Sequence, residues 1–591
     1  MKCNICEIGC GIKDGSAGAC GRYKNDGGKL IELFPDSYLV VCPISAETMP
    51  VMNFYPKAKF LQISTSGCNF DCSGCVATVV AKEVNPDSKA LKKLTPQQIV
   101  AKAKAEECAG VVFLMNDPLA SFYTFLEIAK IAKQSGLLVG CSSNGYFTEH
   151  SLDMIAPYLD FINIGIKGLS DEDYKSCGAP GYEPVIRNIR RFHEKGVHVE
   201  AACMHKKDED EKVGEIADTI AKISRDIPLQ VMRFIPLDDA DISGEPSITE
   251  SERVCARAYE KLDYVYLFNS PGTDCINTYC PKCGTLIYER DFYGPMGSKL
   301  RNAAIAADER HCPKCGHELN IKGTMSEKTY NENDFEGGYP FTRALEIIEG
   351  TLAAIGVRDR KTIVGCWEEA LQGGGLQKLH GNLQDFESYA KKIGHFGKMT
   401  GHESEAYALV KHMKDRIMSI SSRLEGLKKP SVYYVMSNPL FALEEGRLEN
   451  ELVEMAGGIS INKTLGCTGR PGMKISPERL NGLNPDVIVI SSFMPSTLDD
   501  FYASCEKLGI SVSAVENRRI YNYPAPCFDF GSPRWILGLM HIANCLHPDV
   551  FSFDIMAEAE EFYQKFYGIG FRPEDVNRSF AKPVKTWAGA L

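Results

Sequence analysis

From residue 59 onward, short apolar and β-branched segments alternate with stretches of helical character. The segments are KFLQIST (59–65), GVVFLM (110–115), LLVGCSS (137–143), FINIGIK (161–167), VHVEAAC (197–203) and LQVMRFI (229–235). Thr95-Pro96 has the sequence of a helix N-cap followed by proline, and Gly136 and Gly196 stand where helices are expected to stop. Strands that alternate with helices predict a parallel sheet, open or curled into a partial barrel, with functional residues at the carboxyl ends of its strands.

The rest of the chain has a different pattern. Residues 270–322 lose the alternation and carry two CPKCG repeats, and residues 323–340 are polar and Gly/Asn-rich, as in a linker. A long amphipathic helix is predicted at about 402–427, because apolar residues recur there at steps of three and four. They are Tyr407, Val410, Met413, Ile417, Ile420 and Leu424. A second αβ set is predicted from strands at 431–436 and 486–492 and from helices near 449–456, 497–508 and 532–546.

We therefore predict an α/β protein with several units. They are an N-terminal Cys-rich segment (1–58), the strand–helix domain (59–269), a CxxC…CxxC module (270–322), a linker (323–340) and a C-terminal domain (341–591). A length of 591 residues agrees with this division, since a domain has about 150 residues.

Composition and charge narrow the class of protein. Lys and Arg number 66 against 77 Asp and Glu, a formal charge of −11 that argues against a general nucleic-acid binder. No apolar run is long enough to span a membrane, and the N-terminus MKCNICEIGC does not resemble a signal peptide. We expect a cytoplasmic, reducing location, where the 23 cysteines serve as metal ligands rather than as disulfides.

The most specific cysteine motif is GCNFDCSGC, directly after the first predicted strand. Its cysteines, Cys68, Cys72 and Cys75, have CxxxCxxC spacing. Three thiolates on one loop can hold three corners of a 4Fe–4S cluster and leave the fourth iron free to bind a substrate or cofactor. A zinc loop or three unrelated thiols are the alternatives, and the position after a first strand disfavours both.

Two further sets have four cysteines each. Cys3, Cys6, Cys10 and Cys20 suit either an auxiliary iron–sulfur cluster or a structural zinc. Cys280, Cys283, Cys312 and Cys315 form two CPKCG halves that are typical of a zinc ribbon, with a redox cluster as the alternative. Zinc in the second set would stabilise a small loop-rich module that lacks a core of its own.

Residues 1–322 resemble the radical S-adenosylmethionine (SAM) superfamily, and within it the pyruvate formate-lyase activating enzyme group and the AmmeMemoRadiSam type. The matching segments are ACGRY, CPIS…MNFYP, GCNF, MNDP (115–118), SSNGY (142–146), YLDFINIGIKG, RFIP (233–236) and TYCPKCG. The resemblance implies a partial (β/α)6 barrel that binds a 4Fe–4S cluster through Cys68, Cys72 and Cys75. Such enzymes use one electron to split SAM into methionine and a 5′-deoxyadenosyl radical, which removes a hydrogen from a substrate. A ferredoxin or flavodoxin is the implied electron donor.

The resemblance also suggests contacts to SAM. Asn116 and Asp117 match the motif that meets the amino group of SAM. Ser142, Asn144, Lys167 and Arg233 end strands where ribose and carboxylate contacts would lie. Ordinary strand-end polarity is the alternative for each, and Lys167 and Arg233 could simply be ion-paired. The sequence departs from the family at Gly74, where a large apolar residue is usual, and at Gly165, where activating enzymes have an Asp beside a cation.

The last 250 or so residues resemble the periplasmic binding proteins that capture cobalamin, haem and siderophore-type chelates. The matching segments are IGHFGKMTGHESEAYALVKHMKDRI, LVEMAGGISI, LNPDVIVISS and FGSPRWILGLMHIANCLHPDVF. In that family a long helix bridges two αβ lobes; here the second lobe matches and the first, 341–400, is short. Candidate ligand contacts are the loop residues Cys366, Trp367, His380, Cys467, Arg470, Cys527 and Phe528, and the alternative is that they have no special role.

Three functions are compatible with these motifs. The first is a radical SAM enzyme whose C-terminal domain holds or presents a small-molecule, metal-complex or protein substrate. The second is an activating enzyme that places a glycyl radical on a partner protein docked on that domain. The third is a non-catalytic metal-binding or assembly protein. The intact triad and Asn116-Asp117 favour the first two.

Overall fold

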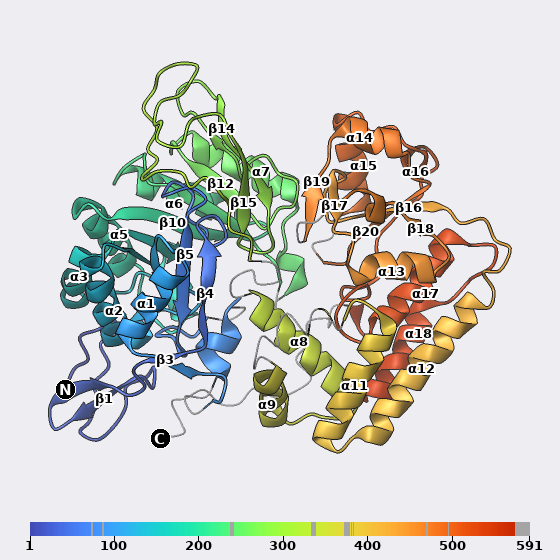
Figure 1. Ribbon diagram of the computed structural model, residues 1–591, viewed down its shortest axis with the longest axis horizontal. Helices are drawn as coiled ribbons and strands as arrows, with labels where there is room; N and C mark the ends of the chain where they lie inside the picture. Colours follow the sequence, from blue (N-terminus) through green and yellow to red (C-terminus); the bar gives the residue numbers. More distant parts are fainter. Residues whose placement is uncertain are drawn as a thin grey trace.

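The computed structural model has an N-terminal half and a C-terminal half, both of α/β type, which lie side by side (Figure 1). It describes residues 1–72, 75–84, 88–236, 241–332, 339–370, 379, 381, 383–467, 471–493 and 496–573. None of the helices in these ranges is long and apolar enough to cross a membrane.

The N-terminal half is built on an eight-stranded sheet in the order β12-β11-β10-β9-β8-β7-β5-β4. Its strands are β4 (Val40–Ser45), β5 (Lys59–Ser64), β7 (Gly110–Phe113), β8 (Leu138–Ser143), β9 (Phe161–Ile166), β10 (His198–His205), β11 (Leu229–Arg233) and β12 (Val265–Phe268). All pairings are parallel except that of β4 with β5. The order begins at β12 and ends at β4, so the sheet is an open, partial barrel. The six predicted strands are confirmed.

The helices of this half pack around the sheet, and α2, α3 and α5 lie on the side away from the C-terminal half (Figure 1). They are α1 (Pro96–Ala105), α2 (Phe122–Gln134), α3 (Glu149–Ile155), α4 (Asp171–Lys175), α5 (Glu183–Glu194), α6 (Asp210–Ala221) and α7 (Ile248–Tyr259). Thr95 and Gln98 form a capping box at the start of α1. Gly136 and Gly196 adopt φ of +75° and +79°, as expected for residues that end helices.

Strand β4 lies inside the segment that the sequence assigned to the Cys-rich N-terminus. It pairs with all of β5, from Val40 opposite Ser64 to Ser45 opposite Lys59. An antiparallel strand at this position covers the polar edge that a parallel sheet would otherwise leave open. The barrel therefore includes residues upstream of 59.

Smaller sheets flank the barrel. They are the hairpin β1 (Tyr23–Asp26)–β2 (Lys29–Glu32), the pair β3 (Ser37–Tyr38)–β6 (Lys92–Lys93), and the three-stranded β13 (Thr278–Tyr279)–β14 (Leu286–Phe292)–β15 (Ser298–Ala303). The N-terminal segment is fixed to the loop after β8, because Thr148 donates to the Asn4 carbonyl and Ser151 to the Ile5 carbonyl. Arg187 completes this attachment with an ion pair to Glu7 at 2.7 Å.

The C-terminal half contains one αβ lobe and a group of helices. The lobe has a mixed sheet in the order β19-β17-β16-β20-β21, with β18 beside β16. Its strands are β16 (Ser431–Val435), β17 (Phe441–Leu443), β18 (Ile459–Ser460), β19 (Gly472–Lys474), β20 (Val487–Ile490) and β21 (Ile520–Tyr521). Its helices are α13 (Leu448–Met455), α14 (Pro477–Leu483), α15 (Leu498–Lys507), α16 (Ser513–Glu516), α17 (Trp535–Leu546) and α18 (Ile555–Phe562).

Among the described residues, the first lobe of a two-lobed binding protein has no αβ counterpart. The described residues of 339–421 form helices: α8 (Tyr339–Ala354), α9 (Arg360–Ala370), α11 (Phe386–Thr400) and α12 (Glu403–Ser421). Their apolar faces pack into one core with α13 and α17. The predicted backbone helix, α12, ends at Ser421 rather than 427, and Gly401 at φ +72° separates it from α11.

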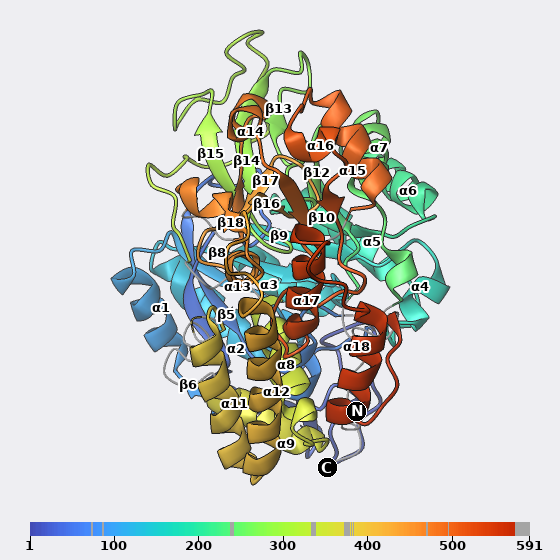
Figure 2. The same cartoon turned by 90° about the vertical axis from the view of Figure 1, so that its right-hand side faces the viewer.

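The two halves share a hydrophobic core. One buried cluster contains Val79, Val80 and Phe292 from the N-terminal half together with Leu345, Phe441 and most of the C-terminal helices. Helix α8 packs against η1 (Val79–Glu83), the short helix that follows the cysteine loop. Figure 2 shows the C-terminal half in front of the parallel sheet. The halves are therefore held together by apolar burial and not by a linker alone.

Candidate functional site

The triad Cys68, Cys72 and Cys75 lies between the carboxyl end of β5 and η1. The Phe70 amide donates to Cys68 Sγ at 3.4 Å, and burial raises the pKa of Cys68 to about 12. Among the described residues, these three sulfurs are not part of any group of three ligand atoms that lie mutually within 4.8 Å. The triad therefore lacks the compact spacing of a single-ion site, and three thiols on one loop can hold three corners of a polynuclear cluster. Gly74 lies outside the described residues.

Asn116 braces this loop. Its amide nitrogen donates to Thr65 Oγ1 and to the Gly67 carbonyl, both at 2.9 Å, and its oxygen accepts from the Thr65 amide at 3.1 Å. The side chain is 3% exposed, so all three bonds are made out of water. In this structure the amide of Asn116 positions the cysteine loop, and its contact to SAM stays a prediction.

Asp117 joins two strand ends. Its carboxylate accepts from the Leu119 amide, the Ser143 hydroxyl and the Asn144 amide at 2.6–2.9 Å. Burial raises the pKa of Asp117 to about 6. Sequence reasoning selected Ser142, but Ser143 is the serine that reaches Asp117, because side chains alternate along β8.

Asn144 and Asn69 form an amide pair across the site. Asn144 Nδ2 donates to Asn69 Oδ1 at 2.8 Å, and Asn69 Nδ2 donates back at 3.5 Å. Asn69 follows Cys68 directly, so the pair ties the cysteine loop to the end of β8. No motif in the sequence indicated this role for Asn69.

Lys167 follows β9 and lies among the cysteine sulfurs. Burial acts to lower the pKa of Lys167, but the thiols of Cys72, Cys177, Cys75 and Cys68 outweigh it and raise that pKa. A Cβ added to Gly165 would lie 3.5 Å from Lys167 Nζ. The ammonium therefore stands beside Gly165, the departure noted in the sequence, and it brings positive charge to the cysteine site.

Cys177 is a fourth thiol at this site that the motif did not reveal. It hydrogen-bonds with Cys72, and this contact lowers the pKa of Cys177 to about 6. Its carbonyl accepts from the Asp71 amide at 2.9 Å. Cys177 is 105 residues from Cys72 in the chain, so no local spacing could have predicted the contact.

Arg233 is ion-paired, as one of the alternatives held. Its Nη1 contacts Glu245 at 2.7 Å and the Pro246 carbonyl at 2.9 Å, and its Nε donates to the Asn269 carbonyl. Nη2 is buried and has no hydrogen-bond partner among the described residues. A role of Arg233 toward SAM stays a prediction.

The CPKCG cysteines form a compact group. The sulfurs of Cys280, Cys283, Cys312 and Cys315 all lie within 4.8 Å of one another, with Cys280–Cys315 at 3.7 Å and Cys283–Cys312 at 3.5 Å. Tetrahedral zinc with bonds of about 2.3 Å places sulfurs about 3.8 Å apart. Gly284 and Gly316 adopt φ of +69° and +68°, so each half makes the same tight turn. The geometry suits one metal ion.

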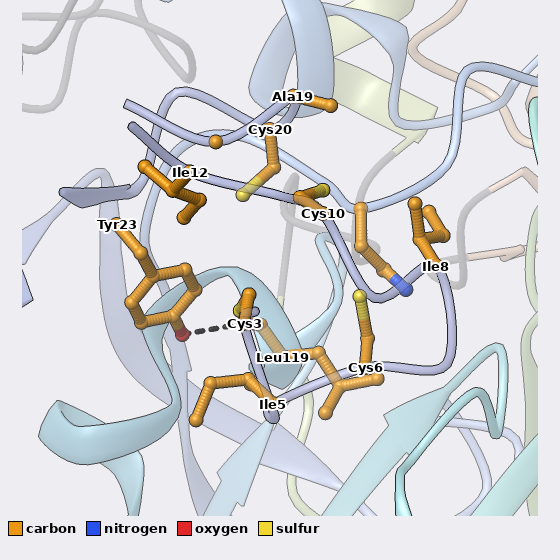
Figure 3. Close-up of a pocket in the computed structure, with 12 residues that line it drawn as sticks. Cys3, Ile5, Cys6, Ile8, Cys10, Ile12, Ala19, Cys20, Tyr23 and Leu119 are labelled. Carbon is orange, nitrogen blue, oxygen red and sulfur yellow. Dashed lines mark hydrogen bonds between the residues drawn. The ribbon is translucent and has the colours of Figure 1, made fainter. Parts of the chain in front are cut away.

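The N-terminal cysteines Cys3, Cys6, Cys10 and Cys20 surround one cavity (Figure 3). Burial raises the pKa of Cys3 and of Cys6, and that of Cys20 to about 11. The structure thus brings together the four cysteines that the sequence grouped.

The C-terminal candidates do not form a metal site among the described residues. Cys366 and Trp367 lie on α9 rather than in a loop, because Ile363, Cys366 and Trp367 recur with helical spacing and face the core. Cys527 belongs to the same core and Cys467 to a different one. Phe528 is fully buried. His380 and Arg470 lie outside the described residues.

A buried polar group that the sequence did not suggest lies at the carboxyl ends of β16 and β20. Asp529 accepts from the Ser492 amide at 2.8 Å, from Ser491 Oγ at 2.9 Å and from the Tyr434 hydroxyl at 3.1 Å. These residues come from three segments that are far apart in the sequence, so no local motif could have indicated the group.

Comparison with known proteins agrees with this geometry. Residues 63–220 match the radical SAM superfamily and residues 364–527 match the periplasmic binding protein family. The chain therefore contains a radical SAM domain and a periplasmic-binding-protein-like domain.

Two curated relatives each match one part of the chain. An uncharacterised protein of Methanocaldococcus jannaschii is 28% identical over 331 residues, which is 54% of this chain and 95% of that protein. An uncharacterised ABC transporter substrate-binding lipoprotein of Bacillus subtilis is 26% identical over 188 residues, 31% of this chain and 57% of the relative.

Solved structures match the C-terminal half. A periplasmic solute binding protein from Veillonella parvula is 23% identical with a TM-score of 0.29, over 33% of this chain and 60% of that one. The molybdate periplasmic binding protein of Haemophilus influenzae is 19% identical with a TM-score of 0.27, over 32% and 58%. The chain thus spans about three fifths of these solute-binding proteins.

Proposed function

We propose that this protein is a radical SAM enzyme that acts on a substrate held or presented by its C-terminal half. The observation that carries the proposal is the cysteine loop of Cys68, Cys72 and Cys75, which lies at the carboxyl end of β5 within the matched domain and is braced by Asn116. When bound, a 4Fe–4S cluster with SAM supplies one-electron cleavage of SAM and hydrogen abstraction. The three cysteines hold the cluster, and Lys167 adds positive charge beside it.

The packing of the two halves supports substrate presentation. Met115 and Ile235, just beyond β7 and β11, pack against the hydrophobic cluster that the halves share. The strand ends that carry Asn116 and Arg233 therefore face the covered side of the sheet. A covered site excludes water and competing reactants, as a radical reaction requires. We infer that the substrate binds between the halves, that a ferredoxin or flavodoxin supplies the electron, and that the cytoplasm is the location.

The test is formation of 5′-deoxyadenosine. The anaerobically reconstituted full chain is incubated with SAM and dithionite, beside a Cys68→Ala control. We expect methionine and 5′-deoxyadenosine from the wild type alone. No product above the control would contradict the enzymatic proposal. A protein-based glycyl radical signal after addition of candidate partner proteins would favour the activating-enzyme function over a substrate held by the C-terminal half.

One observation favours a non-catalytic site. Cys177 lies against Cys72 and supplies a fourth thiol, which could occupy the iron that SAM requires. Addition of SAM to the reduced protein distinguishes the two functions, since SAM bound to iron alters the electron paramagnetic resonance (EPR) spectrum of the cluster. An unchanged spectrum in the wild type and a changed one in Cys177→Ala would support the non-catalytic function.

A further inference from the structure

The N-terminal cysteines enclose space that a single metal ion would not leave. The cavity between Cys3, Cys6, Cys10 and Cys20 has a volume of about 20 Å³ (Figure 3). That is room for about one water, which needs about 10–15 Å³. Four sulfurs that close around zinc at about 2.3 Å leave no such volume between them. The four thiols therefore surround a common space and do not close on a single point.

The spacing of the N-terminal sulfurs also differs from that of a single-ion site. In the CPKCG group all four sulfurs lie within 4.8 Å of one another, whereas no three of the N-terminal sulfurs do so. The same is true of the radical SAM triad, for which the family implies a 4Fe–4S cluster. Within one protein, then, neither the N-terminal set nor the cluster loop has the compact spacing of the CPKCG group.

The surroundings of the cavity are those of a buried thiolate centre. Isoleucines 5, 8 and 12 and Leu119 line it, which limits access of water. Backbone amides donate to the sulfurs, that of Ile5 to Cys3 and that of Ile8 to Cys6. Amide donors and exclusion of water are two of the features through which proteins set the potential of an iron–sulfur cluster.

The cavity adjoins the radical SAM site. Asn69 lines it and is bonded through its backbone to Cys68, the first cysteine of the triad. Tyr23, also in the lining, donates its hydroxyl to the Leu119 carbonyl at 2.5 Å, and Leu119 lies two residues beyond Asp117. One peptide segment, Cys68-Asn69, thus borders both sites.

We propose that Cys3, Cys6, Cys10 and Cys20 bind a second iron–sulfur cluster, which passes electrons to the cluster of the Cys68 loop. This electron transfer, called the relay below, rests on the proposed function, whereas the binding of a second cluster by the N-terminal cysteines does not. A low-potential one-electron donor protein reduces the N-terminal cluster by one electron. That cluster returns to its oxidised state as the electron moves to the cluster of the Cys68 loop, and no atom is transferred. Segment Cys68-Asn69 lies between the two sites on this path.

Metal analysis of the full chain tests the cluster. The wild type, reconstituted anaerobically, is expected to hold about eight irons and about one zinc. A variant without the triad, Cys68→Ala/Cys72→Ala/Cys75→Ala, is expected to keep about four irons and an iron–sulfur EPR signal. Zinc without iron in that variant would overturn the proposal. The iron and zinc contents test whether the N-terminal cysteines bind an iron–sulfur cluster, even if the wild type fails to cleave SAM.

The relay is tested with two reductants. In Cys6→Ser/Cys20→Ser we expect reduction of the remaining cluster by reduced flavodoxin to be lost, while dithionite, a small molecule, still reduces it. About four irons retained at the triad show that this variant has folded. Cys42→Ser, which removes a thiol outside the three sets, is the matched control and should keep reduction by flavodoxin. Equal reduction by flavodoxin in the wild type and the double variant would overturn the relay.

Discussion

Arg360 of the C-terminal half forms an ion pair with Glu83, the last residue of the helix that follows the cysteine loop. The Arg360 Nη2–Glu83 Oε1 distance is 2.7 Å, and Arg360 Nη1 contacts Glu349 at 2.6 Å. The side chains are 9–13% exposed. Glu83 lies eight residues beyond Cys75, so this pair couples the position of the C-terminal half to the cysteine loop.

Arg360→Met is expected to destabilise the protein by about 3–5 kcal/mol, because it leaves two carboxylates together in a mostly buried site. The free energy of unfolding, measured in urea, and the iron content check this expectation. Arg253→Met is the control: its pair with Asp210 is exposed and should contribute no more than about 1 kcal/mol. Equal losses in the free energy of unfolding would show that the Arg360 pair contributes no more to stability than the Arg253 pair does.

Asn116→Ala is expected to lower the iron retained after reconstitution. It leaves the Thr65 amide and the Gly67 carbonyl without their partner, at a cost of about 1–3 kcal/mol for each buried group. Asn163→Ala is the matched control, since Asn163 is a buried amide that bonds Pro50 and Gln230, away from the loop. We expect both variants to lose stability and only Asn116→Ala to lose iron. Full iron retention in Asn116→Ala would show that the loop needs no such brace.

Cys283→Ser is expected to abolish metal binding by the CPKCG group and to lower the melting temperature. Since the module has only a small core of its own, we expect zinc binding there to contribute directly to its folding. The zinc content and calorimetry of the full chain measure both effects. Cys275→Ser, at a cysteine near the module but outside the compact group, should retain zinc. Zinc that remains in Cys283→Ser would place the ion elsewhere.

Titration of Asp117 should give the stability a defined pH dependence. An unfolded Asp has a pKa of about 3.9, whereas burial raises the pKa of Asp117 to about 6. Between these values the folded state binds a proton that the unfolded state has released. The free energy of unfolding should therefore fall as pH rises from about 4 to about 6, and level off above.

The free energy of unfolding should change by about 3 kcal/mol over this range, because the folded and unfolded pKa values of Asp117 lie about two pH units apart. Urea unfolding of the wild type and of Asp117→Asn across this pH range isolates the contribution of this carboxyl, because the variant has no carboxyl group at this position. The difference between the two curves should change below about pH 6 and stay constant above it. A difference that is flat throughout would mean that the three hydrogen bonds to Asp117 fully offset the effect of its burial on the pKa.

Local features of this protein could be read from its sequence. The caps of α1, the glycines that end helices and the spacing within each cysteine set depend on residues a few positions apart. The six barrel strands and the second αβ lobe followed from periodicity, because burial of one face imposes the same alternation on every strand or helix of that kind. The metal-binding potential of the compact CPKCG group is of this local type as well.

The tertiary structure decided what depends on distant contacts. Asn116 braces a loop about 50 residues away in sequence, Cys177 meets Cys72 across the barrel, and Arg360 reaches Glu83 from the other half. Helices replace a first αβ lobe, and β4 joins the barrel from the N-terminal segment. A sequence records which residues are apolar or bind metal; which of them meet is set by packing among elements that are far apart along the chain. The cavity between the four N-terminal cysteines is a further case, since their spacing allowed zinc or iron and only the fold shows that they surround a common space.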